Sequence, residues 1–387
     1  MIKIVTIIGA RPQIIKAAAL SRAIGNHFSN DITEIIVHTG QHYDTNMSQV
    51  FIDELGIPQP DYNLNVGSNS HAQQTAEMII GIENILLKEN PDYIVLYGDT
   101  NSTLAGALAA AKIHIPVVHI EAGLRSFNKT MPEEINRIMC DHCSTMLFSP
   151  TQTGLQNLIN EGFGLHNEFP YSNENPGIFH CGDIMFDNSL YFKNIASEKS
   201  TILQEYNLES GKYILSTIHR DNNTDDPKRL TSILSALIDI AEAENIAVAL
   251  PLHPRTEKMI KVNLDKEILE KFNSNNLIKL LPPVSFLDMI MLESNCKIVM
   301  TDSGGVQKEA YFFNKPGIIL RPETEWVEIV DEGAALIANA DKELIIKAYQ
   351  SLTKNSAIKY PSIFGDGNAA NFICETMINN SAKKESQ

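Results

Sequence analysis

Residues 4–13 have the sequence Ile4-Val5-Thr6-Ile7-Ile8-Gly9-Ala10-Arg11-Pro12-Gln13, in which a β-branched run ends at a glycine and a proline soon follows. The run predicts a buried strand, Gly9 permits a tight turn, and Pro12 stands where a helix would begin. The same order of a short apolar run and a longer amphipathic stretch recurs along the chain. This pattern is typical of βαβ units around a parallel sheet, so we expect an α/β fold.

The strand-like runs form two series. The first comprises Ile4–Ile8, Glu34–His38, Tyr93–Tyr97, Val117–Ile120 and Met146–Ser149, with predicted helices at Pro12–Ile24, Ala72–Lys88, Ser102–Ile113 and Glu133–Cys140. The second comprises Tyr213–Ile218, Ala247–Pro251, Ile278–Leu281, Lys297–Thr301 and Gly317–Arg321. A chain of 387 residues exceeds the size at which one hydrophobic core keeps growing. We therefore expect two doubly wound, Rossmann-like domains.

The boundary between these domains is predicted from composition. The stretch Glu161–Asn175 is rich in Asn, Gly, Glu and Pro and lacks periodicity, which is typical of a loop. The expected domains are therefore residues 1–175 and residues 176–365.

Composition excludes several classes of protein. The formal net charge is −16 and no cluster of Lys and Arg stands out, so nucleic-acid binding is not expected. No apolar stretch approaches the length of a membrane span, and the first residues do not resemble an export signal. Five cysteines, an odd number in a chain of this length, favour a reducing compartment, and we expect a cytoplasmic protein.

Polar residues that directly follow the predicted strands are the first candidates for function, because ligands of open α/β sheets bind at the carboxyl ends of the strands. After the first strand, Arg11 offers a forked cation for phosphate, and Lys16 lies about one helical turn further on. The alternative is that both cations are simply solvated at a helix start. The turn has no G-x-G-x-x-G pattern, so no dinucleotide is implied.

A second candidate is the turn Asp302-Ser303-Gly304-Gly305, which follows an apolar run and precedes a predicted helix. Its backbone N–H groups could bind an anion, and Glu309 could accept hydrogen bonds from ribose hydroxyls. Ser and Asp are also ordinary N-caps, so a purely structural role stays open.

Three acids near strand ends, Asp99, Glu121 and Glu133, are candidates for proton transfer, because a buried carboxylate is costly unless it is paired or functional. Glu133 could instead be the first-turn acid of a helix opened by Pro132. His219 follows a strand-like run and could act in catalysis or be a satisfied loop histidine.

His253 occupies the equivalent position in the neighbouring unit, with the same two interpretations. The run Cys140-Asp141-His142-Cys143 resembles half of a metal site, but no second Cys/His pair lies at a useful spacing. No metal is therefore expected.

Together these motifs resemble the non-hydrolysing UDP-N-acetylglucosamine 2-epimerase family, and they occur in the family's order over nearly the whole chain. The motifs are Gly9-Ala10-Arg11-Pro12-Gln13-Ile14-Ile15-Lys16, Tyr97-Gly98-Asp99-Thr100, His119-Ile120-Glu121-Ala122-Gly123-Leu124-Arg125, Pro132-Glu133-Glu134-Ile135-Asn136-Arg137, His219-Arg220 and Thr301-Asp302-Ser303-Gly304-Gly305-Val306-Gln307-Lys308-Glu309-Ala310.

The resemblance implies a glycosyltransferase-B-like fold with an interdomain cleft, and a C-terminal helix at residues 366–387 that packs back on the first domain. It implies that the C2 proton of a UDP-linked N-acetylated sugar is removed, that UDP leaves C1, and that UDP and a proton then add back with C2 inverted. The resemblance implies a homodimer, and it implies neither a cofactor nor a metal.

The resemblance also assigns roles by motif position. The implied catalytic residues are Asp99, Glu121, Glu133 and His219, and which acid serves which face stays open. The implied nucleotide contacts are Arg11, Lys16, Ser303, Gly304, Gly305 and Glu309.

Some motifs depart from the general family pattern. Gln13 replaces a common glutamate, Met289 stands where some members place an aromatic, and Thr324-Glu325-Trp326 replaces a segment that often carries arginine after glutamate. Four segments look more like the subgroup that acts on UDP-2,3-diacetamido-2,3-dideoxyglucuronate in O-antigen synthesis. They are Gly9-Ala10-Arg11-Pro12-Gln13, Ser216-Thr217-Ile218-His219-Arg220, Pro251-Leu252-His253-Pro254-Arg255-Thr256 and Thr324-Glu325-Trp326-Val327-Glu328.

A uronate adds a carboxylate at C6, which a guanidinium recognises well. We therefore expect Arg255 and the nearby His253 to contribute to sugar specificity, with Arg220 as the alternative cation for the carboxylate. A solvent-exposed, structural Arg255 also stays open.

Three other functions fit the same motifs. A UDP-sugar-dependent glycosyltransferase would share the fold, but it does not need the three acids. A non-catalytic UDP-sugar-binding protein would keep the phosphate contacts and could lose the acids. A hydrolysing epimerase would release free sugar and UDP.

Overall fold

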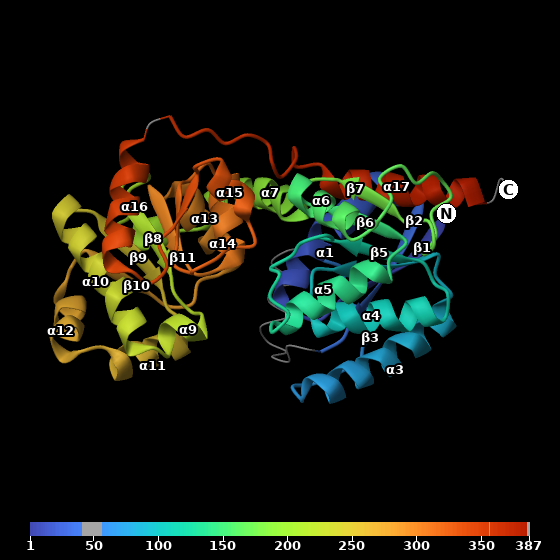
Figure 1. Cartoon of the computed structure of the whole chain (residues 1–387), viewed down its shortest axis with the longest axis horizontal. Coiled ribbons are helices and arrows are strands. Elements are labelled where there is room, and N and C mark those ends of the chain that lie inside the picture. The colour runs from blue at the N-terminus through green and yellow to red at the C-terminus, as the bar shows by residue number, and fades with distance from the viewer. Residues whose placement is uncertain (41–55, 356, 385–387) are drawn as a thin grey trace. The chain divides into compact units, whose positions relative to one another are not determined.

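The computed structural model describes residues 1–40, 56–355 and 357–384, which fall into two compact units (Figure 1). Unit 1 contains Met1–Asn188 and Ser362–Gln387, and unit 2 contains Ser189–Pro361. Each unit is built on a parallel sheet with helices around it. No helix in the described ranges is long and apolar enough to cross a membrane.

Among the described residues, the sheet of unit 1 has seven strands in the order β3-β2-β1-β4-β5-β6-β7. Its strands are β1 (Ile2–Ile8), β2 (Ile32–His38), β3 (Tyr62–Asn63), β4 (Tyr93–Tyr97), β5 (Val117–Ile120), β6 (Met146–Ser149) and β7 (Gly177–His180). β1 pairs in parallel with β2 on one side and with β4 on the other, so the strand order reverses there. Turns that follow β1 and β4 therefore diverge at the edge where α/β proteins bind ligands.

The helices of unit 1 pack on both faces of this sheet. In the part of the chain that the structure describes, they are α1 (Arg11–Ala23), continued by the π-helical segment η1 (Ile24–Phe28), then α3 (His71–Glu89), α4 (Asn101–Lys112), α5 (Pro132–His142), α6 (Gln152–Asn160) and the C-terminal α17 (Ala369–Lys384). α4 packs between α3 and α5, and α17 packs along α1. The N–H groups of Ala369 and Ala370 at the start of α17 donate to Asp187, at 3.2 and 2.8 Å, which fixes this helix on unit 1.

The described residues of unit 2 form a sheet of six parallel strands in the order β10-β9-β8-β11-β12-β13. They are β8 (Tyr213–Thr217), β9 (Ala247–Pro251), β10 (Ile278–Leu281), β11 (Ile298–Thr301), β12 (Gly317–Ile319) and β13 (Ala335–Ile337). The helices are α8 (Ile202–Glu205), α9 (Asp221–Thr224), α10 (Pro227–Glu244), α11 (Pro254–Asn263), α12 (Lys266–Ser274), α13 (Phe286–Asn295), α14 (Gly304–Phe312), α15 (Val327–Asp331) and α16 (Lys342–Lys354).

The central strands of both sheets are buried along their whole length. All residues of β4 and β5 in unit 1, and of β8 and β11 in unit 2, are buried. Sheets covered by helices on both faces favour such continuous apolar runs, which is why these strands were predictable from sequence. Every predicted strand is present, within a few residues at its ends.

The expected boundary near residue 175 is earlier than the one observed. β7 lies beyond it and pairs with β6 as the edge strand of unit 1. The chain then passes from one unit to the other within α7 (Ile184–Lys199), since unit 1 ends at Asn188. A boundary inside a helix has no loop composition to mark it.

Candidate functional site

In unit 1, the turns after β1, β4 and β5 bring a cation and two acids together. Lys16, in the second turn of α1, forms an ion pair with the carboxylate of Glu121, and the two side chains are only 10% and 11% exposed. Gly98 lies against this pair, because a Cβ there would be 3.1 Å from Glu121 Oε2 and 3.2 Å from Lys16 Nζ. A side chain at Gly98 would therefore crowd the pair.

The backbone of this cluster is held in an uncommon conformation. Glu121 has φ 75° and Gly98 has φ 63°, both in the left-handed region. For a non-glycine residue this conformation is costly and persists only where the surroundings fix it, as often occurs at functional sites. The strain at Glu121 thus supports a functional role for its side chain.

Asp99, directly after Gly98, is held by α5. Its Oδ2 lies 3.1 Å from Arg137 Nη2, and its main-chain oxygen accepts a 2.9 Å hydrogen bond from Asn136 Nδ2. Burial raises the pKa of Asp99, Arg137 opposes this shift, and Glu121 adds to it. A carboxyl group with a raised pKa is suited to giving and taking protons.

Glu133 is an exposed residue in the first turn of α5. It lies close enough to Asp99 for its charge to raise the Asp99 pKa. Its neighbour Glu134 has a different role, since it is 1% exposed and accepts hydrogen bonds from Ser126 and Phe127. Glu134 thus holds the loop before α5, while Glu133 faces outward.

The other residues of the first motif divide into one exposed cation and one buried amide. Arg11 is the exposed first residue of α1. Gln13 is buried, and its Nε2 donates to the carbonyl oxygen of Tyr97 at 3.1 Å and to Thr103 Oγ1 at 3.0 Å. Gln13 therefore fastens α1 to the end of β4 and the start of α4.

In unit 2, the ends of β8 and β11 meet at Asp302. This fully buried carboxylate accepts hydrogen bonds from the N–H groups of His219 and Arg220, each at 3.1 Å, and from Asn223 Nδ2 at 3.0 Å. Asp302 Oδ1 also lies 3.4 Å from Nδ1 of His219, whose side chain is 47% exposed. Asp302 thus orients His219, which sequence analysis singled out without its partner.

The helix α14 begins at the predicted anion-binding turn. Ser303 is its N-cap, and Gly304 and Gly305 form its first turn. Further along α14, Glu309 lies beside the buried Glu293, whose pKa is raised well above its usual value by burial and by Glu309. The capping role and the predicted binding role are compatible, since the N–H groups not used by the cap can still bind an anion.

A loop between β12 and α15 covers this helix start. Glu325 approaches Gly304 so closely that a Cβ there would overlap its carboxylate. Arg321 Nη2 lies 2.6 Å from Glu325 Oε2. Burial alone would raise the pKa of Glu325, but the Arg321 guanidinium outweighs burial and lowers it. The Lys308 ammonium lies 4.5 Å from the centre of the Trp326 ring.

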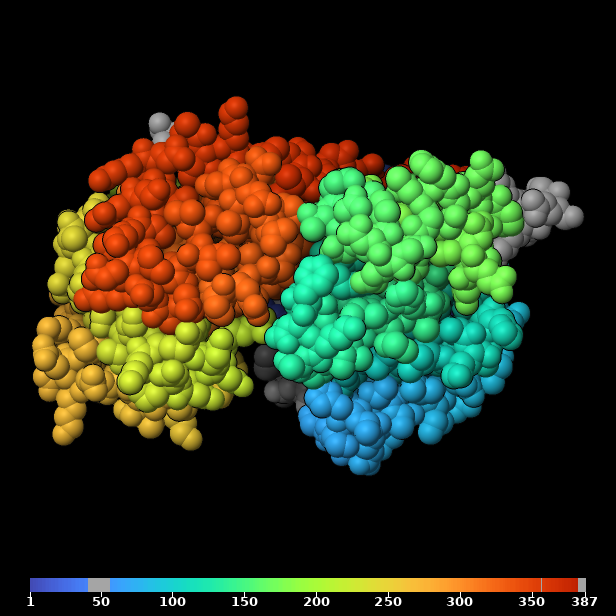
Figure 2. All heavy atoms as spheres, in the orientation of Figure 1, coloured from blue at the N-terminus to red at the C-terminus, as the bar shows by residue number. Residues whose placement is uncertain are grey.

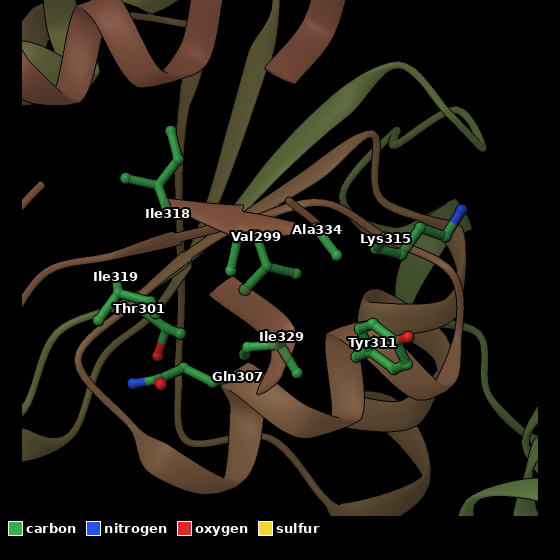
Figure 3. A pocket seen from close by; sticks show the side chains of 11 residues that line it. Val299, Thr301, Gln307, Tyr311, Lys315, Ile318, Ile319, Ile329 and Ala334 are labelled. Atoms are coloured by element: carbon green, nitrogen blue, oxygen red, sulfur yellow. The ribbon is translucent and has the colours of Figure 1, made fainter. Parts of the chain in front are cut away.

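Behind α14 lies a small hollow between this helix, α15 and the sheet (Figure 3). Gln307 lines it, accepts a 2.6 Å hydrogen bond from Thr324, and has no hydrogen-bond partner for Nε2 among the described residues. The hollow is lined by Val299, Thr301, Gln307, Tyr311, Lys315, Gly317, Ile318, Ile319, Ile329, Ala334 and Ala335. Most of these side chains are apolar, so the hollow is part of the core rather than a sugar site.

The two residues predicted to set sugar specificity lie together at the start of α11. His253 is the N-cap, and its Nδ1 accepts the N–H of Arg255 at 3.3 Å, so it fits the interpretation as a satisfied loop histidine. Both Arg255 Nη2 contacts to Asp225 are 2.8 Å, and Arg255 Nη1 pairs with Asp221. The Arg255 guanidinium therefore already binds two carboxylates.

Sequence analysis missed the buried residues that hold Asp99 and the turns of the candidate acids. His119 and Asp141 each lie in a segment named in the sequence analysis. They are 22 positions apart, so the local sequence does not indicate that they form a pair. Arg137 and Asn136 were likewise quoted without a role. The signal that could have found them is a charged residue within an otherwise apolar strand or helix face.

The chain matches known proteins over nearly its whole length. Residues 26–378 match the family described as UDP-N-acetylglucosamine 2-epimerase. A UDP-2,3-diacetamido-2,3-dideoxy-D-glucuronate 2-epimerase of Pseudomonas aeruginosa is 45% identical over 96% of this chain and 98% of its own. A UDP-N-acetylglucosamine 2-epimerase homolog of Methanococcus maripaludis is 48% identical over 97% of this chain and 99% of its own.

The fold is shared with solved structures. The crystal structure of Methanocaldococcus jannaschii UDP-GlcNAc 2-epimerase in complex with UDP-GlcNAc and UDP matches with a TM-score of 0.83 and 40% identity. The match covers 97% of this chain and 99% of the other. The predicted α/β fold of glycosyltransferase-B-like type is confirmed, and the chain belongs to the UDP-N-acetylglucosamine 2-epimerase family.

Proposed function

We propose that this protein inverts C2 of a UDP-linked N-acetylated sugar, without net hydrolysis, by eliminating and re-adding UDP. The observation that supports this most directly is the cluster at the carboxyl ends of β4 and β5, where Asp99 and the strained Glu121 lie with Lys16. Membership of the epimerase family gives the reaction class.

The chemistry asks for groups that move protons at carbon. The C2 proton is weakly acidic, so one carboxylate takes it while UDP leaves C1 with the bonding electrons, and a C1–C2 double bond forms. UDP then adds back to C1 as an acid returns a proton to the opposite face of C2. Asp99, Glu121 and Glu133 are the proposed proton carriers.

Protein groups, rather than a metal, are proposed to stabilise the departing diphosphate. The N–H groups of Gly304 and Gly305 and the hydroxyl of Ser303, at the start of α14, offer donors, and Arg11 and Lys16 offer cations. His219, oriented by Asp302, is proposed to assist the diphosphate or a proton transfer. Glu309 is proposed to accept hydrogen bonds from the ribose.

The sugar is proposed to be UDP-N-acetylglucosamine or its 2,3-diacetamido glucuronate analogue. The Pseudomonas relative that is named for the analogue supports the second substrate. A role in the synthesis of surface polysaccharide such as O-antigen is part of the proposal. Arg255 stays the proposed carboxylate contact, although it would have to exchange Asp221 or Asp225 for the sugar.

We also propose a cytoplasmic homodimer. The outward face of α3 supports self-association, because Ile80 and Leu87, two turns apart on this helix, are 64% and 63% exposed. This helix lies at the surface of unit 1, where it is blue in Figure 2. Burial of such side chains in a second copy would remove apolar area from water.

The deciding experiment offers both sugars in parallel, with no acceptor, and follows C2 by NMR. The proposal expects the C2 epimer of at least one sugar, with UDP still attached. Binding without epimer would favour a non-catalytic UDP-sugar-binding protein. Free sugar with UDP would favour a hydrolysing epimerase. In a second arm with an added acceptor, sugar transfer without any C2 epimer would favour a glycosyltransferase.

A further inference from the structure

His119 is a fully buried histidine in β5, and both of its ring nitrogens face hydrogen-bond partners. Nδ1 lies 2.7 Å from Asp141 Oδ1, and Nε2 lies 2.8 Å from the carbonyl oxygen of Gly98. A carbonyl oxygen can only accept, so Nε2 carries a proton. The state of the ring therefore depends on whether Asp141 is a carboxylate.

Asp141, which is also fully buried, has donors on its other oxygen. Its Oδ2 accepts the N–H of Gly123 at 3.1 Å and lies 2.7 Å from Arg125 Nη1. Burial alone would raise the pKa of Asp141, but His119 and Arg125 together hold it below its usual value. Asp141 is thus ionised, and Nδ1 of His119 must donate to it.

Both ring nitrogens of His119 are therefore protonated, and the ring is a buried imidazolium. Asp141 balances its charge, and Glu161 balances Arg125 through contacts of 2.7 Å to Nε and Nη2. The Cys140 thiol also faces the ring from α5. A buried charge is tolerated when it is paired and hydrogen-bonded in this way.

The two ends of this pair hold the backbone turns of the candidate acids. The imidazolium binds the carbonyl of Gly98, the residue directly before Asp99. The carboxylate binds the N–H of Gly123, two residues after Glu121. Gly98, Glu121 and Gly123 all have left-handed backbone, with φ of 63°, 75° and 80°, so both turns need such restraint.

We propose that His119 and Asp141 are positioning residues: the buried imidazolium–carboxylate pair fixes the turns that carry Asp99 and Glu121, so that both acids are aligned for proton transfer at C2. The role in proton transfer rests on the proposed function. The charge state of the His119 ring is independent of it. Neither residue touches the sugar in this role.

Asp141→Asn separates charge from shape. The amide oxygen can still accept from Gly123 and Arg125, while the amide N–H₂ faces Nδ1 of His119 and leaves the ring neutral. We expect kcat to fall roughly ten- to a hundredfold, the scale of a small misplacement of reacting groups, with KM nearly unchanged. His119→Phe, which removes both donors, should lose at least as much.

The matched control is Ser144→Ala. Ser144 follows α5, and its buried hydroxyl donates a hydrogen bond to the carbonyl oxygen of Cys140 at 2.7 Å. The substitution should lower stability without lowering kcat. The ¹⁵N spectrum of wild-type His119 should show two protonated ring nitrogens over the whole pH range in which the protein stays folded.

Two results would overturn the proposal: a neutral His119 ring in the wild type, or an Asp141→Asn enzyme with full kcat. If a variant fails to fold, the wild-type ring spectrum still decides the charge of the pair. If the wild type epimerises neither sugar, the proposed function fails, and the spectrum continues to test the pair separately.

Discussion

Glu121→Gln should reduce both turnover and stability, and the structure allows the two losses to be separated. The ion pair with Lys16 is about nine-tenths buried, and the amide oxygen can still accept a hydrogen bond from the ammonium. We therefore expect the free energy of unfolding to fall by about 1–3 kcal/mol, the scale of a charged hydrogen bond. This is less than the roughly 3–5 kcal/mol expected when a buried charge loses its partner entirely.

The loss of turnover should be larger than the loss of stability can explain. If Glu121 transfers a proton, kcat should fall about a hundredfold or more, while UDP binding measured by calorimetry changes little. A double-mutant cycle that combines Glu121→Gln with Lys16→Met, measured by urea unfolding, should show a coupling energy of about 0.5–3 kcal/mol between the two side chains. The double variant should not regain turnover. Epimer formation is measured by NMR under conditions where all variants are folded.

Glu89→Gln is the matched control. Glu89 ends α3, its side chain is 17% exposed, and it pairs with Lys3 at the start of β1, near the opposite ends of the strands. It should cost stability and leave kcat unchanged. Normal turnover in Glu121→Gln, or a loss that equals the unfolded fraction, would refute the assignment of Glu121 to proton transfer.

Four further substitutions test other parts of the site and the fold. Arg255→Leu should weaken the diacetamido uronate by about 1.5–3 kcal/mol and spare UDP-N-acetylglucosamine, whereas equal losses would limit Arg255 to holding its own loop. Gly304→Ala should weaken UDP binding roughly tenfold or more in calorimetry, because the methyl group overlaps Glu325, and Gly305→Ala, whose Cβ meets nothing closer than 3.8 Å, should cost less. Burial raises the pKa of Asp187 to about 6, so unfolding free energy should fall as pH rises from about 4 to 6 and level off above, because the folded state binds the extra proton. Asp187→Asn should remove this slope in urea titrations, and an unchanged slope would contradict the assignment.

The central strands and the positions of the site motifs could be predicted from the sequence. Buried parallel strands require continuous apolar runs, and their carboxyl ends are where polar residues gather in this fold class. The edge strands β3, β7 and β13 were missed, since they have only two to four residues and weak patterns. The unit boundary was missed because it lies inside α7.

Side-chain partners were less predictable than positions. Nothing in the local sequence indicates that Asp221 and Asp225 hold Arg255, because these residues lie about 30 positions apart. Adjacent acids also diverge: Glu134 turns inward to hold a loop, whereas Glu133 is exposed. The residue at which α5 begins, Pro132, decides which of these two neighbours points inward. The identity of either acid alone does not reveal this orientation.

The most direct test of the proposed chemistry is epimerisation in deuterium oxide. Elimination leaves no hydrogen on C2, and the returning proton comes from an acid that exchanges with solvent. The C2-inverted UDP-sugar should therefore carry deuterium at C2, which NMR and mass spectrometry detect. Product that keeps its original C2 hydrogen throughout would contradict proton exchange with solvent by Asp99, Glu121 and Glu133.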